Sequence, residues 1–358
     1  MIGSEPFVCL DFSLDRLSAV EVVDGRVARW TVQPLVSGSL RGGDPMDPKQ
    51  LAAQFKTALA RAGITARKAR IVISDDAAVV RVVEVPRIPK RHMAGAIRYL
   101  SEQETPFPPG RASLAWDVIE RRQNTVRVYL AAAWKDVVQR LVDTAKAAGL
   151  DPQVIEPRSL AVNRAIGREQ AIVIDAGETL ASLTYVSRTE TPFADQVPVL
   201  GDGKWEAANL MLRRALRGNR GEAPPVLLAG ELEAEANEPE AAMLGVAAYP
   251  ASTALNGHGP IRPPGIPGGA LLGALGLAMR GVQSPGRAKY PDVNLLPGRK
   301  ASVAANQPST SADQPSAPKA SRRLVIAGAA VGVVGVWSVV AGGIAILLGW
   351  SPHLPLGP

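Results

Sequence analysis

The chain carries one short pattern twice, an apolar strand that ends in aspartate and then turns into a second strand. The first copy reads VCLDFSLDRLSAVEV over residues 8–22, and the second reads VIDAGETLASLTYV over residues 173–186. Apolar runs separated by a few small or polar residues predict antiparallel strand pairs. Two such hairpins, far apart in one chain, predict a duplicated α/β core with a cleft between its halves.

Helical and extended patterns alternate between the two hairpins. PKQLAAQFKTALARAG, residues 48–63, places Leu51, Phe55 and Leu59 at helical spacing, and Gly63 ends the helix. SLAWDVIE and TVRVYLAAA, at residues 113–120 and 125–133, alternate as the two strands of a hairpin. Mixed patterns of this kind favour an α/β fold.

Composition excludes several kinds of site. Cys9 is the sole cysteine, so no internal disulfide forms. The formal charge is +7, but no dense Lys/Arg run has interleaved aromatic residues, which argues against nucleic-acid binding. His92, His258 and His353 are scattered and fit neither zinc spacing nor a nucleophilic catalytic set. The sequence therefore predicts no catalytic residue and no metal site.

A long uncharged run lies near the C-terminus. Residues 324–350 contain no charged side chain and would span about 40 Å as a helix, against a hydrocarbon core of roughly 30 Å. Lys and Arg precede this run and none follows it. The positive-inside rule therefore predicts one transmembrane helix in the inner (cytoplasmic) membrane, with residues 1–323 in the cytoplasm and the tail 351–358 outside.

Two smaller features accompany this span. Gly328 and Gly332 form one GxxxG pattern, which could be a helix-pairing face, although glycine is common in membrane helices. Residues 301–323 are rich in Ser, Ala, Pro and Gln and have too little apolar surface to fold, so they are expected to be a disordered linker. The N-terminus lacks the basic and apolar regions of a signal peptide.

Three stretches of the body resemble a known family. They are RYLSEQETPFPPGRASLAWDV (98–118), DVVQRLVDTAKAAGLDPQVIEPRSLAVNRA (136–165) and GGALLGALGLAMRGV (268–282). They resemble the PilM family, the actin-like cytoplasmic proteins of type IV pilus assembly, over about residues 6–282. The resemblance implies an actin-like, ribonuclease H-like duplicated body over residues 1–283. An inserted subdomain is expected at about 76–155 and a reduced second lobe at 165–283.

Residues 284–300 contain a short apolar cluster, Val293-Asn294-Leu295-Leu296-Pro297. Asn-Leu-Leu-Pro is similar to the motif that members of the PilN family, small bitopic partners of PilM, carry before their membrane helix. The resemblance implies that this segment docks in a groove of the body, in the same molecule or in a sister molecule. The alternative is a mildly apolar linker without a binding role.

The resemblance also places six residues at a nucleotide cleft: Asp11, Ser13, Asp175, Gly177, Thr179 and Gly230. Several neighbours depart from the family pattern, because Ser13, Asp15 and Ser18 replace a glycine, a hydroxyl residue and a lysine, and Glu178 adds a negative charge. The family also inserts a subdomain after the second hairpin, which walls one side of the cleft. Here too few residues separate this hairpin from the next apolar strand, so the subdomain is expected to be missing. We therefore expect a degenerate pseudo-ATPase without a cofactor, in which Asp11 and Asp175 cap turns.

Together these features predict a membrane-anchored scaffold of type IV pilus or related secretion assembly, which docks cytoplasmic machinery at the inner membrane. Its expected partners are other inner-membrane pilus or secretion proteins, with self-association as a further option. Two alternatives stay open. One is an actin-like ATPase that retains ATP and Mg binding, and the other is the actin-like membrane component of type II secretion.

Overall fold

A five-stranded mixed sheet forms the centre of the first lobe. Its order is β10-β6-β1-β2-β3, in which β1, β6 and β10 are parallel and β2 runs antiparallel to both neighbours. The strands are β1 (Phe7–Asp11), β2 (Arg16–Val23), β3 (Arg26–Pro34), β6 (Lys68–Ile73) and β10 (Asp151–Pro157). Central strands covered on both faces are apolar throughout, as Val8, Cys9 and Leu10 are.

The second lobe repeats this arrangement. Its sheet has the order β13-β12-β11-β14-β15, again with three parallel strands, β11, β14 and β15, and two antiparallel pairings through β12. The strands are β11 (Gln170–Ala176), β12 (Leu180–Ser187), β13 (Phe193–Pro198), β14 (Val226–Gly230) and β15 (Ala248–Pro250). The predicted duplication of an Asp-ended hairpin within an α/β core is therefore confirmed.

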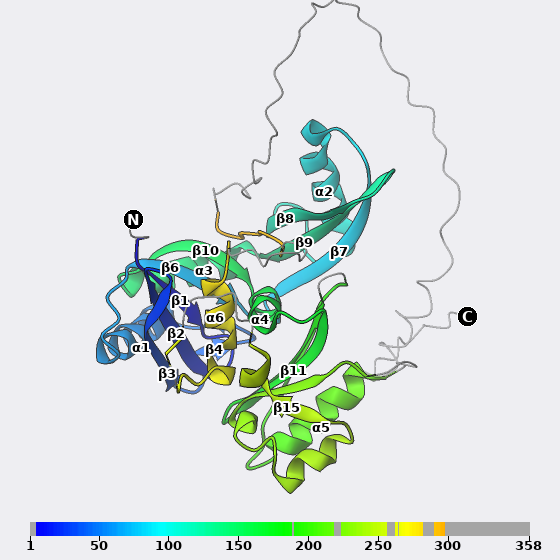
Figure 1. Ribbon diagram of the computed structural model, residues 1–358. Helices are drawn as coiled ribbons and strands as arrows, with labels where there is room; N and C mark the ends of the chain where they lie inside the picture. Colours follow the sequence, from blue (N-terminus) through cyan, green and yellow to red (C-terminus); the bar gives the residue numbers. More distant parts are fainter. Residues whose placement is uncertain are drawn as a thin grey trace, which may run out of the picture. The chain divides into compact units, whose positions relative to one another are not determined.

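The computed structural model describes residues 5–187, 190–217, 223–255, 262–263, 265–281 and 290–297 (Figure 1). These all belong to one unit, residues 1–304, and residues 305–358 form a second unit outside the described part. None of the helices within the described ranges has the length and apolarity needed to cross a bilayer. The predicted span 324–350, its Gly328 and Gly332, the linker and the tail all lie outside these ranges.

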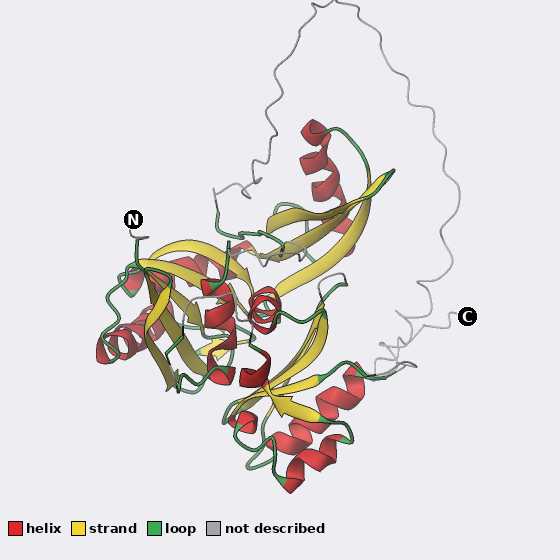
Figure 2. Ribbon diagram, in the orientation of Figure 1, coloured by secondary structure: helices red, strands yellow, loops and turns green. Residues whose placement is uncertain are grey.

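Helices cover both faces of the first sheet (Figure 2). On one face α1 (Pro48–Arg61) and α3 (Lys135–Ala147) bury the predicted Leu51, Phe55 and Leu59. Asp47 begins α1 by accepting hydrogen bonds from two backbone N–H groups of its first turn, a common N-cap. On the other face α6 (Leu272–Ala278) packs on β1 and on α4 (Arg158–Ile166).

Helix α4 is shared by the two lobes. Its Ala161 belongs to the apolar cluster of the first sheet, and its Val162 and Ala165 belong to that of the second. The opposite face of the second sheet is covered by α5 (Lys204–Ala215), the helix between β13 and β14. Short 3₁₀ turns complete the lobes: η1 (Glu231–Glu233), η2 (Pro239–Leu244), η3 (Ala251–Ala254) and η4 (Gly269–Leu271).

An inserted subdomain separates β6 from α3. Its three-stranded sheet has the order β7-β9-β8, from β7 (Ala78–Pro86), β8 (Ala112–Arg121) and β9 (Thr125–Trp134), and α2 (Lys90–Glu104) packs on it through Met93 and Ile97. The hairpin of β8 and β9 matches the prediction, whereas β7 was not recognised. The subdomain covers fewer residues than the predicted 76–155, because α3 and β10 pack within the first lobe.

A two-stranded ribbon, β4 (Leu40–Arg41) and β5 (Asp44–Pro45), precedes α1.

Candidate functional site

Asp11 ends β1 inside the molecule and is 6% exposed. Its Oδ1 accepts a hydrogen bond from the backbone N–H of Ser13 at 3.1 Å and another from the Ser13 hydroxyl. This local bonding is the turn-capping role expected for aspartate after a strand. Gly273 of α6 lies so close that a Cβ atom there would come within 2.0 Å of Asp11 Oδ2. Only glycine allows this helix to pack against the carboxylate.

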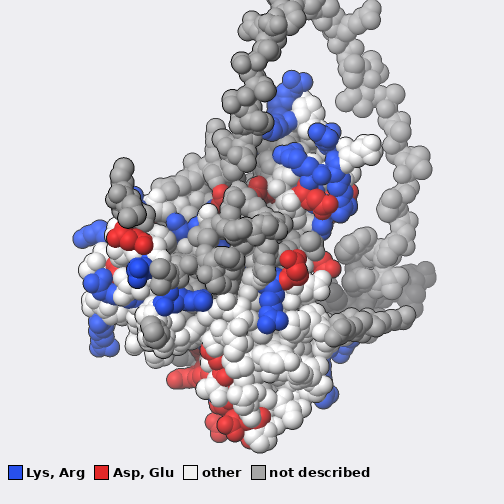
Figure 3. All heavy atoms as spheres, viewed as in Figure 1, with Lys and Arg blue, Asp and Glu red and all other residues white. Residues whose placement is uncertain are grey.

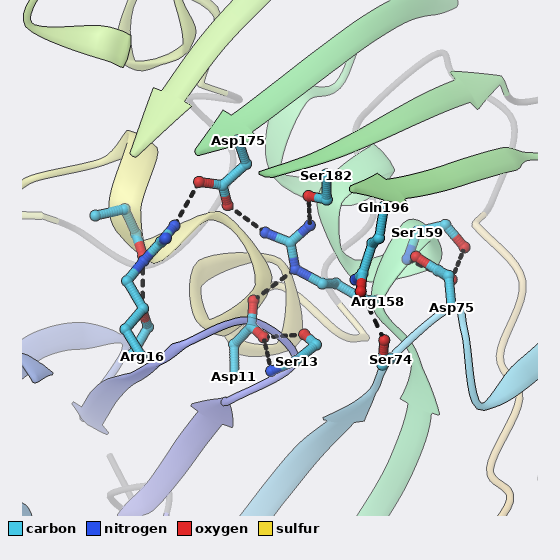
Figure 4. Close-up of polar contacts among 12 residues, drawn as sticks. Asp11, Ser13, Arg16, Ser74, Asp75, Arg158, Ser159, Asp175, Ser182 and Gln196 are labelled. Carbon is cyan, nitrogen blue, oxygen red and sulfur yellow. Dashed lines mark hydrogen bonds and ion pairs between the residues drawn. The ribbon is translucent and has the colours of Figure 1, made fainter. Parts of the chain in front are cut away.

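Arg158, the first residue of α4, joins the two predicted aspartates (Figure 4). Its Nε donates to Asp11 Oδ2 at 3.0 Å and its Nη2 donates to Asp175 Oδ2 at 2.5 Å. The Arg158 side chain is 3% exposed. Burial by itself lowers the pKa of this guanidinium, but the two carboxylates outweigh it and raise the pKa. For Asp11 burial opposes ionisation, yet the charge of Arg158 and the Ser13 hydrogen bonds hold its pKa below the usual value.

Arg16, the first residue of β2, completes the ion-paired cluster. Its Nη2 pairs with Asp175 Oδ1, so each oxygen of this buried carboxylate accepts from a different arginine. Asp175 is 1% exposed, and a buried charge of this kind needs such pairing to be tolerated. Neither arginine was predicted as a site residue. Nothing in the local sequence marks them, because the two aspartates lie elsewhere in the chain.

Asp15 makes a second link between the lobes, at the turn between β11 and β12. Its Oδ2 accepts hydrogen bonds from the Thr179 backbone N–H at 2.6 Å, the Thr179 hydroxyl at 2.9 Å and the Leu180 backbone N–H at 3.2 Å. Gly177 and Thr179, predicted on the nucleotide side, therefore lie beside a carboxylate from the first turn. In the sequence Asp15 is only a departure from the family pattern, and no local signal marks it as a bonded group.

A cleft of about 350 Å³ opens beside these links. Both hairpin turns line it, together with the loop 34–40 and the predicted Gly230. Glu178 and Glu231 add carboxylates to its lining. Such a lining opposes a polyphosphate by charge repulsion. Among the described residues of the wall the single cation is Arg16, which already pairs with Asp175. Within the described ranges, no group of three or more acidic, His or Cys side chains is placed to hold a metal ion.

Residues 290–297 lie along β10, at the edge of the first sheet. The Leu295 backbone N–H donates to the Ile155 carbonyl at 2.8 Å. The Asn294 side chain accepts from the Ile155 N–H and donates to the Gln153 carbonyl, both at 3.0 Å. The segment thus satisfies backbone groups that an edge strand would otherwise expose.

Apolar side chains of this segment enter the core of the first lobe. Val293 is 0% exposed and Leu295 is 2% exposed, and both belong to the cluster beneath α1 and α3. Leu296 is half-buried against the same cluster, and Pro297 is exposed. Val293 and Leu295 are therefore the buried apolar residues of the predicted motif.

Arg280, just beyond α6, fixes the start of the segment. Its guanidinium pairs with Asp292 and Glu156, and its Nη1 donates to the Val293 carbonyl at 2.7 Å. The Asp292 backbone N–H donates to Asp117 Oδ2 of β8 at 2.9 Å. The segment therefore contacts the first lobe, the end of α6 and the inserted subdomain.

Charge is distributed unevenly over the unit. Figure 3 shows Lys and Arg gathered on the inserted subdomain. Exposed residues there include Lys90 and Arg91 in the first turn of α2, which contains no acidic residue. Positive side chains at a helix N-terminus oppose the helix dipole. On the face shown in Figure 3, Lys and Arg thus cluster on this subdomain, and others lie on the first lobe.

Comparison with known proteins identifies the family. The family model described as type IV pilus assembly protein PilM matches residues 10–193, more than half of the chain. The chain belongs to this family. A solved PilM-PilN type IV pilus biogenesis complex aligns with a TM-score of 0.60 and 22% identity, covering 77% of this chain and 98% of the solved one. A search of curated protein sequences found no match.

Two further solved structures are less similar. The cytoplasmic domain of EpsL, an inner membrane component of the type II secretion system of Vibrio cholerae, has a TM-score of 0.43 and 15% identity, covering 63% of this chain and 82% of its own. The ethanolamine utilization protein EutJ of Carboxydothermus hydrogenoformans has a TM-score of 0.45 and 11% identity, covering 77% and 89%. The actin-like fold of this PilM-family chain therefore rests on its duplicated sheets and on the PilM match.

Proposed function

We propose that this PilM-family protein is a membrane-anchored scaffold of type IV pilus, or related secretion, assembly. Residues 1–323 lie in the cytoplasm in this proposal, and residues 324–350 cross the inner membrane. Residues 293–297 dock on the body as a PilN-like element. The observation that carries the proposal is the contact of residues 290–297 with β10.

The contacts have the features of strand addition to a sheet edge. In that mode backbone hydrogen bonds supply affinity and side-chain pockets supply specificity. Leu295 contributes one backbone hydrogen bond, to the Ile155 carbonyl, and one buried side chain. The side-chain amide of Asn294 accepts the hydrogen bond of the Ile155 N–H, which a backbone carbonyl would accept in a regular strand. Fully burying a Val or Leu side chain stabilises by roughly 1.5–3 kcal/mol. Burial of Val293 and Leu295 in the core of the first lobe therefore favours the bound state of the segment.

The segment belongs to the same chain as the β10 edge that it contacts, which favours docking within one molecule. An intramolecular ligand has a high effective concentration, so a similar peptide from another protein would have to compete with it. Exchange between sister molecules uses the same contacts and is the alternative that the test below includes. Partners in this proposal are inner-membrane proteins of the pilus or secretion machinery, recruited to a body held at the membrane.

We further propose that the body is a degenerate ATPase. Arg158 and Arg16 already neutralise Asp11 and Asp175, and carboxylates line the cleft. Among the residues that the structure describes there, magnesium-nucleotide would therefore meet Arg16, Asp11 and Asp175 only in their ion-paired form. The opposing hypothesis is an actin-like ATPase with retained nucleotide binding. Calorimetric titration of the purified chain with ATP and Mg²⁺ discriminates between them, because micromolar magnesium-dependent binding would contradict the pseudo-enzyme proposal.

A cleavable chain tests the docking. A protease site is inserted between residues 282 and 289 of the full-length protein in detergent, and the cut protein is analysed by size-exclusion chromatography. We expect the C-terminal piece to stay with the body after cleavage. The pair of substitutions Leu295→Asp and Leu296→Asp should release it, whereas Pro297→Ala, at an exposed position, should not.

Release of the unsubstituted piece, or equal retention of the Asp-substituted one, would contradict docking through these leucines. Mixing two differently tagged chains before cleavage separates the two forms of docking. A C-terminal piece that is recovered on the other tagged body indicates exchange between molecules, and recovery only on its own body indicates docking in one molecule.

A further inference from the structure

The turn between β11 and β12 gathers three donors on one oxygen atom. They are the backbone N–H groups of Thr179 and Leu180 and the hydroxyl of Thr179, which lie 2.6–3.2 Å from Asp15 Oδ2. Converging N–H groups of a turn form a concave site for an anion, and hydrogen bonds to a charged acceptor are stronger than neutral ones. The carboxylate of Asp15 is the anion that fills this site in the structure.

The turn is shaped to receive this carboxylate. A Cβ atom on Gly177 would lie 2.1 Å from Asp15 Oδ1 and 2.8 Å from Oδ2, which no side chain permits. The Gly177 N–H is used within the turn, where it donates to the Leu180 carbonyl at 2.8 Å. Thr179 and Leu180 therefore supply the N–H groups that point at Asp15, and glycine supplies the space.

The same two turns are joined a second time nearby. Arg16 follows Asp15 in the first lobe and pairs with Asp175, which lies before the second turn. Asp15 and Arg16 thus place one negative and one positive group of the first lobe on complementary partners of the second. Both links join segments that are far apart in the sequence, so they restrict movement of one lobe against the other.

We propose that Asp15 is a built-in anion, which occupies the phosphate-type site of the second turn and latches the two lobes together without a bound ligand. Removing the carboxylate empties an anion site that inorganic phosphate then fills. This inference deepens the pseudo-ATPase proposal and is independent of docking by residues 290–297, whose contacts are with other elements.

The test compares Asp15→Ala with Glu178→Ala in the full-length protein. Glu178 lies in the same turn and is exposed, so its removal lowers the negative charge of the cleft without touching the three donors. Thermal unfolding is measured in chloride and in millimolar inorganic phosphate at equal ionic strength. We expect Asp15→Ala to lower Tm by on the order of 5 °C and phosphate to restore most of that loss. The difference in Tm between wild type and Glu178→Ala should be the same in phosphate as in chloride.

Two measurements keep the test decisive if Asp15→Ala folds poorly. Asp15→Asn preserves the size of the side chain and removes its charge, so it should lower Tm by less than Asp15→Ala does. Amide hydrogen exchange of a peptide covering residues 177–182 should be slow in wild type, although Thr179 is exposed, and faster in Asp15→Asn.

An equal Tm for Asp15→Ala and Glu178→Ala, or phosphate stabilisation of all three proteins alike, would overturn the latch. Unchanged hydrogen exchange in Asp15→Asn would do the same. The outcome is separable from the nucleotide question, because ATP binding by wild type contradicts the pseudo-ATPase proposal, whereas phosphate rescue of Asp15→Ala concerns the turn alone.

Discussion

Asn294 Oδ1 lies 3.0 Å from the backbone nitrogen of Ile155 and accepts its hydrogen bond, at the edge of the first sheet. The carbonyl of Ile155 is bonded by the next residue of the segment, Leu295, at 2.8 Å. Both backbone groups of this edge residue are therefore satisfied by residues far along the chain. Substitutions at four positions, Asn294, Leu295, Arg158 and Asp75, test what this edge and the buried polar groups contribute.

Asn294→Ala should destabilise the folded chain by about 1–3 kcal/mol, because it leaves the Ile155 N–H without its acceptor. Asn294→Asp keeps an acceptor and loses the donor to the Gln153 carbonyl, so it should cost less. Urea unfolding of the full-length chain measures both. A smaller loss for Ala than for Asp would show that this hydrogen bond is not the important one.

Leu295→Ala should lower the free energy of unfolding by about 2–5 kcal/mol, since the side chain is 2% exposed within the core of the first lobe. Leu200→Ala is a matched control, because Leu200 is 80% exposed and surface changes usually stay within about 0.5 kcal/mol. Chemical denaturation gives both values. Equal effects for the two leucines would mean that residue 295 is not buried in solution.

Arg158→Met should destabilise by roughly 3–5 kcal/mol, because Asp11 and Asp175 lose a buried counter-charge. Arg158→Lys should recover only part of this loss, since one ammonium cannot reproduce the planar contacts to two carboxylates. Arg121→Met, at an exposed position, controls for losing an arginine. Thermal and chemical unfolding would contradict the expectation if Met and Lys at residue 158 behaved alike.

Asp75 should make stability fall as pH rises between about 4 and about 6. Its burial raises the pKa to about 6 in the folded state, although Ser159 donates two hydrogen bonds to it at 2.7 and 3.2 Å. The folded chain therefore binds this proton more tightly than the unfolded chain does, and the stabilisation present at lower pH is lost on ionisation.

Unfolding measured across this pH range checks the Asp75 prediction. Asp75→Asn should remove this part of the pH dependence, with Asp202→Asn, an exposed aspartate, as the control. The lowered pKa of Asp11 makes a contribution of the opposite sign to the pH dependence of stability. Its stabilisation is present at neutral pH and is lost only as the pH falls through the acidic range. If the stability of Asp75→Asn depends on pH as that of wild type does, Asp75 is not the cause of this pH dependence.

The hydrophobic pattern was sufficient for much of the fold. The apolar runs on either side of the turns after Asp11 and Asp175 predicted both hairpins, and Leu51, Phe55 and Leu59 predicted the buried face of α1, as the structure confirms. These signals are local, because the period of apolar residues follows from the geometry of a strand or helix. β7 was not predicted, although AVVRVVEVP is a run rich in valine of the kind that favours a strand.

The duplicated α/β core, the resemblance to PilM and the apolar residues Val293, Leu295 and Leu296 could all be recognised in the sequence. The pairing of Arg158 and Arg16 with Asp175, the contact of Asp15 with the turn at Thr179, and that of Asn294 with Ile155 became visible only in the folded chain. The reason is physical: apolar burial depends on spacing along one element, whereas hydrogen bonds and ion pairs depend on ångström-scale placement of groups that the fold brings together from distant parts of the chain.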